Sequence, residues 1–228
     1  MGLAYAVASG GAFLNWPAPK PRKVLYIDGE MPAVEMQKRL ASIVETSELQ
    51  PPDPSHFELV TPDLQARGVP DLTTVEGQGA INALIEKQGT ELLILDNLST
   101  LCRGGRENEA ESWQEMQDWL LALRSQRVSV LLVHHAGKGG QQRGTSRRED
   151  VLDTIIRLEH PSDYCAEDGA RFVIHLDKAR TIVGDGAKSI EVALGPAGWT
   201  YKSADEARID RVVQMKSDGM TQRDIAAE

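Results

Sequence analysis

The sequence predicts an α/β protein whose core is a wound, mainly parallel β-sheet. Two strongly apolar runs, within 91–100 and 128–135, are typical of central parallel strands, which are buried on both faces. Segments with the 3.6-residue periodicity of amphipathic helices separate the early strands from one another. After residue 150 the pattern changes to an alternation of apolar and polar residues, which favours antiparallel strands at the sheet edge. This order of elements indicates a wound sheet followed by an antiparallel edge.

The first half of the chain predicts helices and strands in alternation. A helix over 3–9 ends at Gly10, because glycine is the usual residue just after a helix. A strand over 24–28 follows, and Pro32 fits the first turn of a helix that continues to about residue 47. The elements expected next are a short strand at 57–60, a helix at about 77–88, the strand within 91–100, a helix at 109–126 and the strand at 128–135.

The C-terminal part predicts four antiparallel strands and then helices. A helix is expected over 204–217, and a second begins after Thr221, a good N-cap with Asp224 three positions on. This second helix resembles the opening of a helix-turn-helix. We therefore expect an α/β core over 1–202 and a helical module over 203–228. The four segments expected as strands are 154–160, 171–180, 188–194 and 199–203.

The composition excludes several classes of protein. A net charge of −9 argues against a broadly basic protein that coats DNA, although a local basic site is compatible with it. Aromatic residues make up only 5% of the chain, too few for a stacking platform for single-stranded nucleic acid. The two cysteines, Cys102 and Cys165, fit a reducing compartment. No stretch approaches the roughly 20 apolar residues of a membrane span, and we expect a cytoplasmic protein.

Acidic residues follow two of the predicted strands. Asp96 ends the strand within 91–100, where nucleotide-hydrolysing folds hold Mg²⁺ beside phosphates; alternatively, it caps the following turn. Glu30 follows the strand 24–28 and could deprotonate an attacking water. The alternative for Glu30 is a helix-start glutamate favoured by the helix dipole. Asp28 competes for the same role, and spacing alone leaves both open.

Two histidines end a third strand. His134 and His135 are adjacent, and adjacent strand residues point to opposite faces, so the pair does not favour one shared metal. We expect one of them to face the same crevice as Asp96 and Glu30, where it would sense or polarise bound phosphate.

Four motifs carry a resemblance to a known group of proteins. "YIDGEMP", "LLILDNLST", "LLVHHAGKGGQQRGTS" and "LDKART" follow one another as do the later motifs of RecA-fold ATPases. The similarity is greatest to the RepA-like and DnaB-like hexameric replicative helicases, an AAA family group, and covers about residues 1–200. The resemblance implies that Glu30 is the catalytic base, which sets Asp28 aside. It also implies that Asp96 is the Walker B aspartate, holding Mg²⁺ through water, and that His135 is the polar sensor.

The resemblance also implies partners. The loop "GKGGQQRGTS" is similar to one that faces the central channel, where Lys138, Arg143 and Arg147 would contact DNA phosphates; a solvated loop is the alternative. Lys178 and Arg180 resemble the lysine and arginine finger that reach a neighbouring subunit's ATP. A pair of exposed edge-strand cations is the alternative there. The expected cofactors are ATP and Mg²⁺, and the expected partners are single-stranded DNA and further copies in a hexamer.

The phosphate-binding loop of such ATPases is not in the chain. No G-x-x-x-x-G-K-[ST] occurs, and "AGKGG" at 136–140 lacks the spaced first glycine and the Ser or Thr. In the family this loop precedes a helix like 3–9, so we expect the loop and the first strand upstream of Met1. The chain would then be an inactive fragment of a longer ATPase. The alternatives are a DNA-binding adaptor with a helix-turn-helix, and a RecA-fold ATPase of recombination or signalling type without helicase activity.

Overall fold

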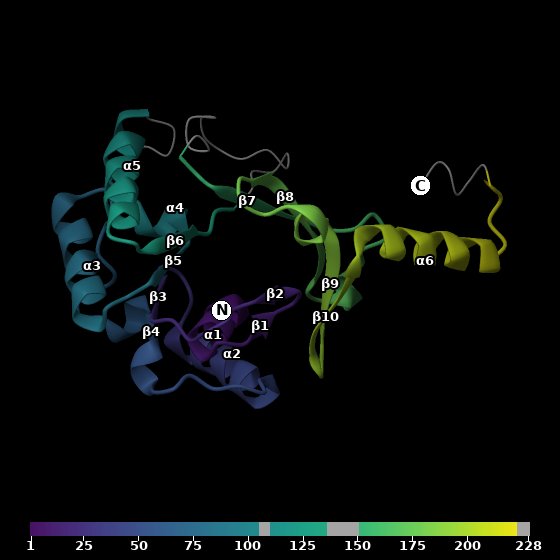
Figure 1. The fold of residues 1–228 in the computed structure, drawn as a ribbon, viewed down its shortest axis with the longest axis horizontal. Coiled ribbons are helices and arrows are strands. Elements are labelled where there is room, and N and C mark those ends of the chain that lie inside the picture. The colour runs from purple at the N-terminus through teal and green to yellow at the C-terminus, as the bar shows by residue number, and fades with distance from the viewer. Residues whose placement is uncertain (105–109, 136–150, 223–228) are drawn as a thin grey trace. The chain divides into compact units, whose positions relative to one another are not determined.

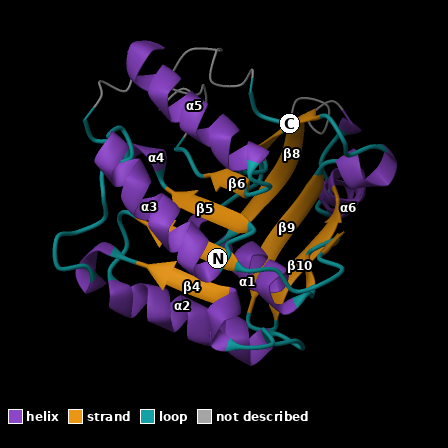
Figure 2. Cartoon of the chain, turned by 60° about the vertical axis from the view of Figure 1, so that its left-hand side comes forward, coloured by secondary structure: helices purple, strands orange, loops and turns teal. Residues whose placement is uncertain are grey.

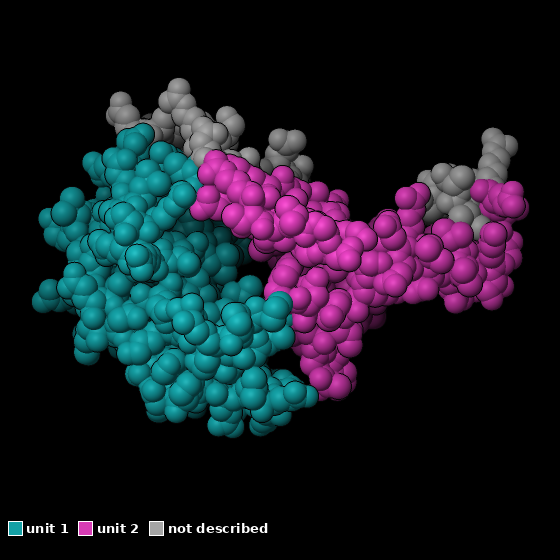
Figure 3. Space-filling view, viewed as in Figure 1, with its two compact units in different colours: residues 1–13, 17–151 teal, residues 14–16, 152–228 magenta. Residues whose placement is uncertain are grey.

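The computed structural model describes residues 1–104, 110–135 and 151–222, which fall into two compact units (Figure 3). The first unit contains Met1–Phe13 and Pro17–Val151, and the second contains Leu14–Trp16 and Leu152–Glu228. The elements up to residue 151 (Figure 1) are α1 Gly2–Ser9, β1 Ala12–Phe13, β2 Trp16–Pro17, β3 Val24–Asp28, α2 Ala33–Thr46, β4 Phe57–Val60, α3 Val75–Gln88, β5 Leu92–Asp96, α4 Leu98–Leu101, α5 Ala110–Ser125 and β6 Ser129–Leu132. Those that follow are β7 Thr154–Glu159, β8 Arg171–Ala179, β9 Ile190–Gly195, β10 Gly198–Ser203 and α6 Ala204–Ser217.

The first unit is built on a four-stranded parallel sheet with the order β4-β3-β5-β6. On one face of the sheet, Leu25 and Leu93 pack with side chains of α3 and α5, among them Ile81 and Leu123. On the other face, β3 and β5 pack against α1 and α2. Helices therefore cover both faces (Figure 2), which confirms the predicted wound parallel sheet.

Local sequence signals explain where the helices begin and end. The side chain of Thr74 accepts a hydrogen bond from the backbone N–H of Gly77 at 3.0 Å, so α3 begins at Val75, two residues earlier than expected. The same helix ends at Gly89, whose φ of 71° is left-handed and strains any residue with a side chain. The predicted strand at 57–60 and helix at 204–217 are confirmed with the expected bounds.

The second unit is built on an antiparallel sheet with the order β10-β9-β8-β7. The four strands occur where the alternation predicts them, but they form a sheet of their own. They are not edge strands of the parallel sheet, because they pair only with one another, each with its neighbour along the chain. Their apolar face centres on Ile174, Ile190 and Val192, and Leu14 and Trp16 pack against these side chains.

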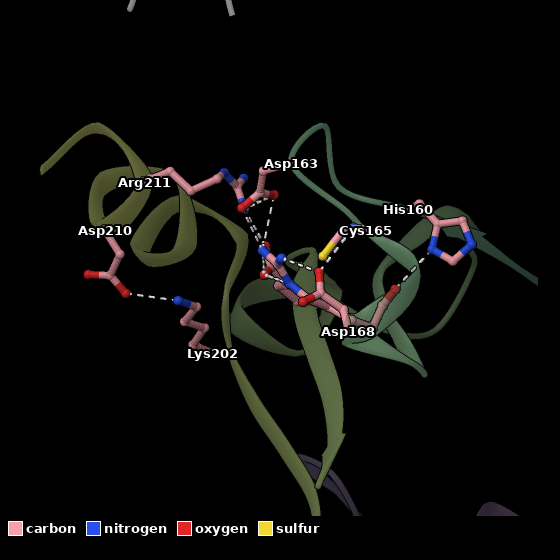
Figure 4. A network of polar contacts seen from close by, with 9 residues as sticks. His160, Asp163, Cys165, Asp168, Lys202, Asp210 and Arg211 are labelled. Atoms are coloured by element: carbon pink, nitrogen blue, oxygen red, sulfur yellow. Dashed lines mark hydrogen bonds and ion pairs between the residues drawn. The ribbon is translucent and has the colours of Figure 1, made fainter. Parts of the chain in front are cut away.

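A network of ion pairs holds α6 to this sheet (Figure 4). Arg171 lies on β8, and its guanidinium donates to the carboxylates of Glu191 at 2.8 Å and Asp163 at 2.9 Å. Arg211 on α6 donates to the other oxygen of Glu191 at 2.6 Å. Glu191 is only 5% exposed, and two guanidinium groups compensate its buried charge.

Three features differ from the sequence prediction or lie beyond what the structure describes. Trp16–Pro17 forms β2, which pairs with β1, and neither of these short strands is among the predicted elements. The strand expected at 128–135 spans only Ser129–Leu132, so His134 and His135 follow it. Residues 223–228 lie outside the described ranges, so the second C-terminal helix and the boundary at 202 stay predictions. In the part of the chain that the structure describes, no helix is long and apolar enough to span a bilayer.

Candidate active site

The carboxyl ends of β3, β5 and β6 are neighbours at one edge of the parallel sheet. The register of β3 and β5 pairs Asp28 with Asp96. β6 flanks β5 on its other side, where Leu95 pairs with Leu132 and accepts the backbone N–H of Val133 at 2.9 Å. Ligands of α/β proteins bind outside this edge of the sheet.

Asn97 joins Glu30 and His135. The carboxylate oxygen Oε2 of Glu30 accepts a hydrogen bond from Nδ2 of Asn97 at 2.7 Å, and this Nδ2 lies 3.0 Å from Nε2 of His135. The distance between Glu30 Oε2 and His135 Nε2 is 3.8 Å. The side chains of Glu30 and His135 are more than half exposed, whereas Asn97 is buried. The structure thus brings two of the predicted residues together around a buried amide.

The short helix α4 holds the side chain of Asn97 in place. Asn97 is the N-cap of this helix, and its Oδ1 accepts the backbone N–H of Thr100 at 3.2 Å. The next residue, Leu98, donates its backbone N–H to the carbonyl of Val133 at 3.0 Å. The amide that contacts Glu30 and His135 therefore has a rigid base.

Asp28 closes the turn after β3. Its Oδ1 accepts the backbone N–H groups of Glu30 at 2.8 Å and of Met31 at 2.5 Å. Burial raises the pKa of the Asp28 carboxyl. The two hydrogen bonds from backbone N–H groups oppose this rise, and the negative charge of Asp96 adds to it. This geometry gives Asp28 a structural part in the turn and leaves the exposed carboxylate of Glu30 to face solvent.

Asp96 is oriented by Tyr26. The hydroxyl of Tyr26 donates a hydrogen bond to Oδ2 of Asp96 at 2.5 Å. Burial raises the pKa of Tyr26, and the bond to Asp96 raises it further, so this hydroxyl remains a donor at neutral pH. The sequence left open that Asp96 caps the following turn. In the structure Asn97, not Asp96, caps α4. An oriented carboxylate at a strand end is suited to hold a hydrated Mg²⁺.

The remaining predicted residues lie elsewhere. Lys178 is on β8, opposite Ile155 of β7, and Arg180 follows β8, where it forms an ion pair with Asp153 at 3.2 Å. Both belong to the second unit. The loop residues Lys138, Arg143 and Arg147 fall outside the described residues. The predicted roles of these five residues stay predictions.

Two residues of the site were not found from the sequence. Asn97 stands directly before "LST", and an asparagine before a helical segment is an N-cap signal that points to a structural part only. Gly29 donates its backbone N–H to the carbonyl of Asp96 at 2.7 Å. A Cβ atom at Gly29 would lie 2.4 Å from Oγ1 of Thr100, a contact between segments that no local pattern reveals.

The described residues 1–104, 110–135 and 151–222 contain no group of three or more His, Cys, Asp and Glu side chains placed to hold a metal ion. The predicted Mg²⁺ contact of Asp96 is through water, and it stays a prediction.

Comparisons with known proteins point to one family. A family model described as an AAA domain matches residues 1–141. A search of curated proteins gave no match. Among solved structures, a KaiC-like protein from the hyperthermophilic archaeon Pyrococcus horikoshii OT3 is similar, with 14% identity and a TM-score of 0.53. The match covers 79% of this chain and 76% of that chain. At this identity the likeness shows the fold, which is the RecA-like arrangement predicted from the motifs.

Proposed function

Since the chain belongs to the AAA domain family, a family of P-loop ATPases, we propose that it is part of an ATP-hydrolysing DNA motor of the RepA-like helicase type. One observation carries the ATPase proposal. Glu30, Asp96 and His135 lie at the carboxyl ends of three neighbouring parallel strands, at the sheet edge where α/β proteins bind nucleotides.

The three side chains suit the three tasks of phosphate hydrolysis. Glu30 has one carboxylate oxygen held by Asn97, so its second oxygen is available to accept the proton of an attacking water. Asp96, held by Tyr26, would anchor a hydrated Mg²⁺. His135 would donate a hydrogen bond to the terminal phosphate.

The residues present fit one half of a Mg²⁺-ATP site. Carboxylates gather at the strand ends, which suits a hydrated divalent cation. Bound Mg²⁺-ATP would supply the bond to be cleaved and the charge that offsets these carboxylates. The sequence has no G-x-x-x-x-G-K-[ST] loop, and we include in the proposal that residues outside these 228 supply the phosphate cradle.

The assignment to a helicase is supported by the order of the four motifs. Under this proposal Lys178 and Arg180 act on the nucleotide of a neighbouring subunit, in a hexamer. Lys138, Arg143 and Arg147 contact the phosphates of single-stranded DNA in the central channel. The negative net charge restricts such contacts to a local basic loop.

The test compares Mg²⁺-ATP binding and hydrolysis by the wild type and by Glu30→Gln, in this chain and in a version extended upstream. We expect hydrolysis only in the extended version. There, Glu30→Gln should lower kcat by about 10²- to 10⁴-fold and leave ATP affinity nearly unchanged, because the base is lost and the binding groups remain. Calorimetry measures the binding, and phosphate release measures the rate.

Glu35→Gln is the matched control, because the Glu35 side chain is exposed on the outer side of α2, where it pairs with Lys38. It should hydrolyse ATP at the wild-type rate. Absence of ATP binding from both versions would contradict the ATPase proposal and favour the adaptor. Hydrolysis that single-stranded DNA does not stimulate would contradict the helicase assignment and leave an ATPase of another type.

A further inference from the structure

Asn97 has one amide nitrogen between two side chains of the site. Nδ2 carries two hydrogens, and it lies 2.7 Å from Oε2 of Glu30 and 3.0 Å from Nε2 of His135. Both distances are normal for hydrogen bonds. One buried group can therefore fix the carboxylate and the imidazole at once.

The orientation of this amide is determined by its other end. Oδ1 of Asn97 lies 3.2 Å from the backbone nitrogen of Thr100, which can only donate. The oxygen must face Thr100, because an NH₂ group there would set two donors against each other. The NH₂ group consequently faces Glu30 and His135.

This orientation determines which ring nitrogen of His135 carries the proton. An amide NH₂ has no lone pair to offer, so the His135 nitrogen 3.0 Å from it must be the acceptor. A ring that accepts at Nε2 is neutral and has its proton on Nδ1. Glu30 also requires a donor at the shared position, so one amide satisfies both neighbours.

We propose that Asn97 is a positioning residue, which holds the Glu30 carboxylate and fixes His135 in the neutral Nδ1–H form. The inference deepens the proposed function and rests on it for its catalytic meaning. With Nε2 engaged, the donor that His135 offers to a phosphate oxygen is Nδ1–H. With Oε2 of Glu30 engaged, the proton of the attacking water goes to Oε1.

The experiment reads the tautomer directly, in the chain labelled with ¹⁵N at histidine. Long-range ¹H–¹⁵N spectra are recorded well above the ordinary histidine pKa of about 6.5, and the spectrum of His135→Gln identifies the His135 signals. We expect a protonated Nδ1 and an unprotonated Nε2. In Asn97→Asp, Nε2 should carry a proton, because the new carboxylate and that of Glu30 both accept there.

The variants separate positioning from folding. Asn97→Asp keeps an acceptor for the Thr100 N–H, and aspartate is as good an N-cap as asparagine, so α4 should persist. Thr100→Val is the control, because it removes a hydroxyl that lies 3.0 Å from the carbonyl of Asn97 and leaves the amide NH₂ in place. This control should keep Nδ1–H. The wild-type spectrum is decisive even if a variant does not fold.

Each outcome has a distinct meaning. Nε2–H in the wild type, or an unchanged ring in folded Asn97→Asp, overturns the positioning proposal and leaves the ATPase proposal standing. The expected tautomers without ATP hydrolysis in the extended version support positioning and contradict the ATPase. In an extended version that hydrolyses ATP, Asn97→Asp should lower kcat by about tenfold or more and change KM less than about threefold.

Discussion

Gly29 lies where the turn after β3 passes close to α4. A Cβ atom added there would lie 2.4 Å from Oγ1 of Thr100 and 2.9 Å from Cδ2 of Leu101. Its backbone N–H also donates to the carbonyl of Asp96. The absence of a side chain therefore allows the turn that presents Glu30 to approach the end of β5.

Gly29→Ala should destabilise the first unit. Overpacking of a close contact costs about 1–3 kcal/mol, because neighbouring atoms must move. Urea unfolding measures the loss. The matched control is Gly79→Ala in the middle of α3, where a Cβ meets nothing within 4 Å. This control should stabilise the helix by about 0.5–1 kcal/mol. Equal effects of the two changes on the free energy of unfolding would show that the close contact of Gly29 with α4 does not cause the destabilisation.

The charge of Asp28 predicts a pH dependence. Its pKa in the folded state is raised above the ordinary 3.8, so the folded state holds this proton more tightly than the unfolded state. Ionisation of this carboxyl therefore lowers the free energy of unfolding as the pH rises from 3.8 through the raised pKa. Asp28→Asn keeps an oxygen for the N–H groups of Glu30 and Met31 but cannot ionise.

We expect the stability of Asp28→Asn relative to the wild type to increase as the pH rises above the ordinary value of 3.8, and to level off once the carboxyl is ionised in both the folded and the unfolded state. Urea unfolding of both proteins across this range gives the difference in free energy. A difference that does not vary with pH would show that Asp28 titrates alike in the folded and unfolded states.

At the scale of elements, buried and exposed ion pairs of the antiparallel sheet should differ in energy. Arg171 contacts the buried Glu191, and Arg157 on β7 contacts the more exposed Glu159 and Asp177. Both guanidinium groups bridge two or more carboxylates, so the surroundings are the main difference. Loss of one partner is costly only where the remaining charge stays out of water.

Arg171→Ala should therefore cost about 3–5 kcal/mol in the free energy of unfolding, and Arg157→Ala about 0–1 kcal/mol. Thermal or urea unfolding followed by circular dichroism compares the two. Because Arg211 also contacts Glu191, Arg171→Ala should fall toward the low end of its range. A loss for Arg157→Ala as large as that for Arg171→Ala would contradict this explanation.

At the scale of the whole molecule, the second unit is assembled from two distant parts of the sequence. Leu14 and Trp16 pack on the apolar face of the antiparallel sheet, more than 130 positions before its first strand. A piece of the chain that begins at Leu152 would lack these side chains. The second unit is therefore not one continuous stretch of the sequence.

Trp16→Ala should destabilise the second unit. Removing a buried tryptophan side chain costs about 3–5 kcal/mol, and we expect about 2–3 kcal/mol here because Trp16 is only partly buried. Hydrogen exchange of amides on β8 and β9 measures the local loss. Trp16→Phe keeps an aromatic side chain and should lose less. Equal protection in Trp16→Ala and the wild type would show that Trp16 does not contribute to the stability of this unit.

The sequence by itself determined the long helices, the main strands and the class of the fold. The apolar run Leu92–Leu95, the glycine that ends α3 and the alternation after residue 150 act through near neighbours, so single-sequence patterns find them. The same patterns placed Asp28, Glu30 and Asp96 at strand ends. The strands follow one another in parallel order, so these residues could be expected at one edge of the sheet.

Only the tertiary structure decided how those residues are arranged. The turn buries the carboxylate of Asp28 and leaves that of Glu30 exposed, a difference that spacing along the chain does not show. Asn97 meets Glu30 across 67 positions of the chain and His135 across 38, separations over which no local pattern carries information. The separate antiparallel sheet and the packing of Leu14 and Trp16 are long-range contacts as well. Such contacts depend on the packing of whole elements, whereas sequence patterns report the preferences of residues a few positions apart.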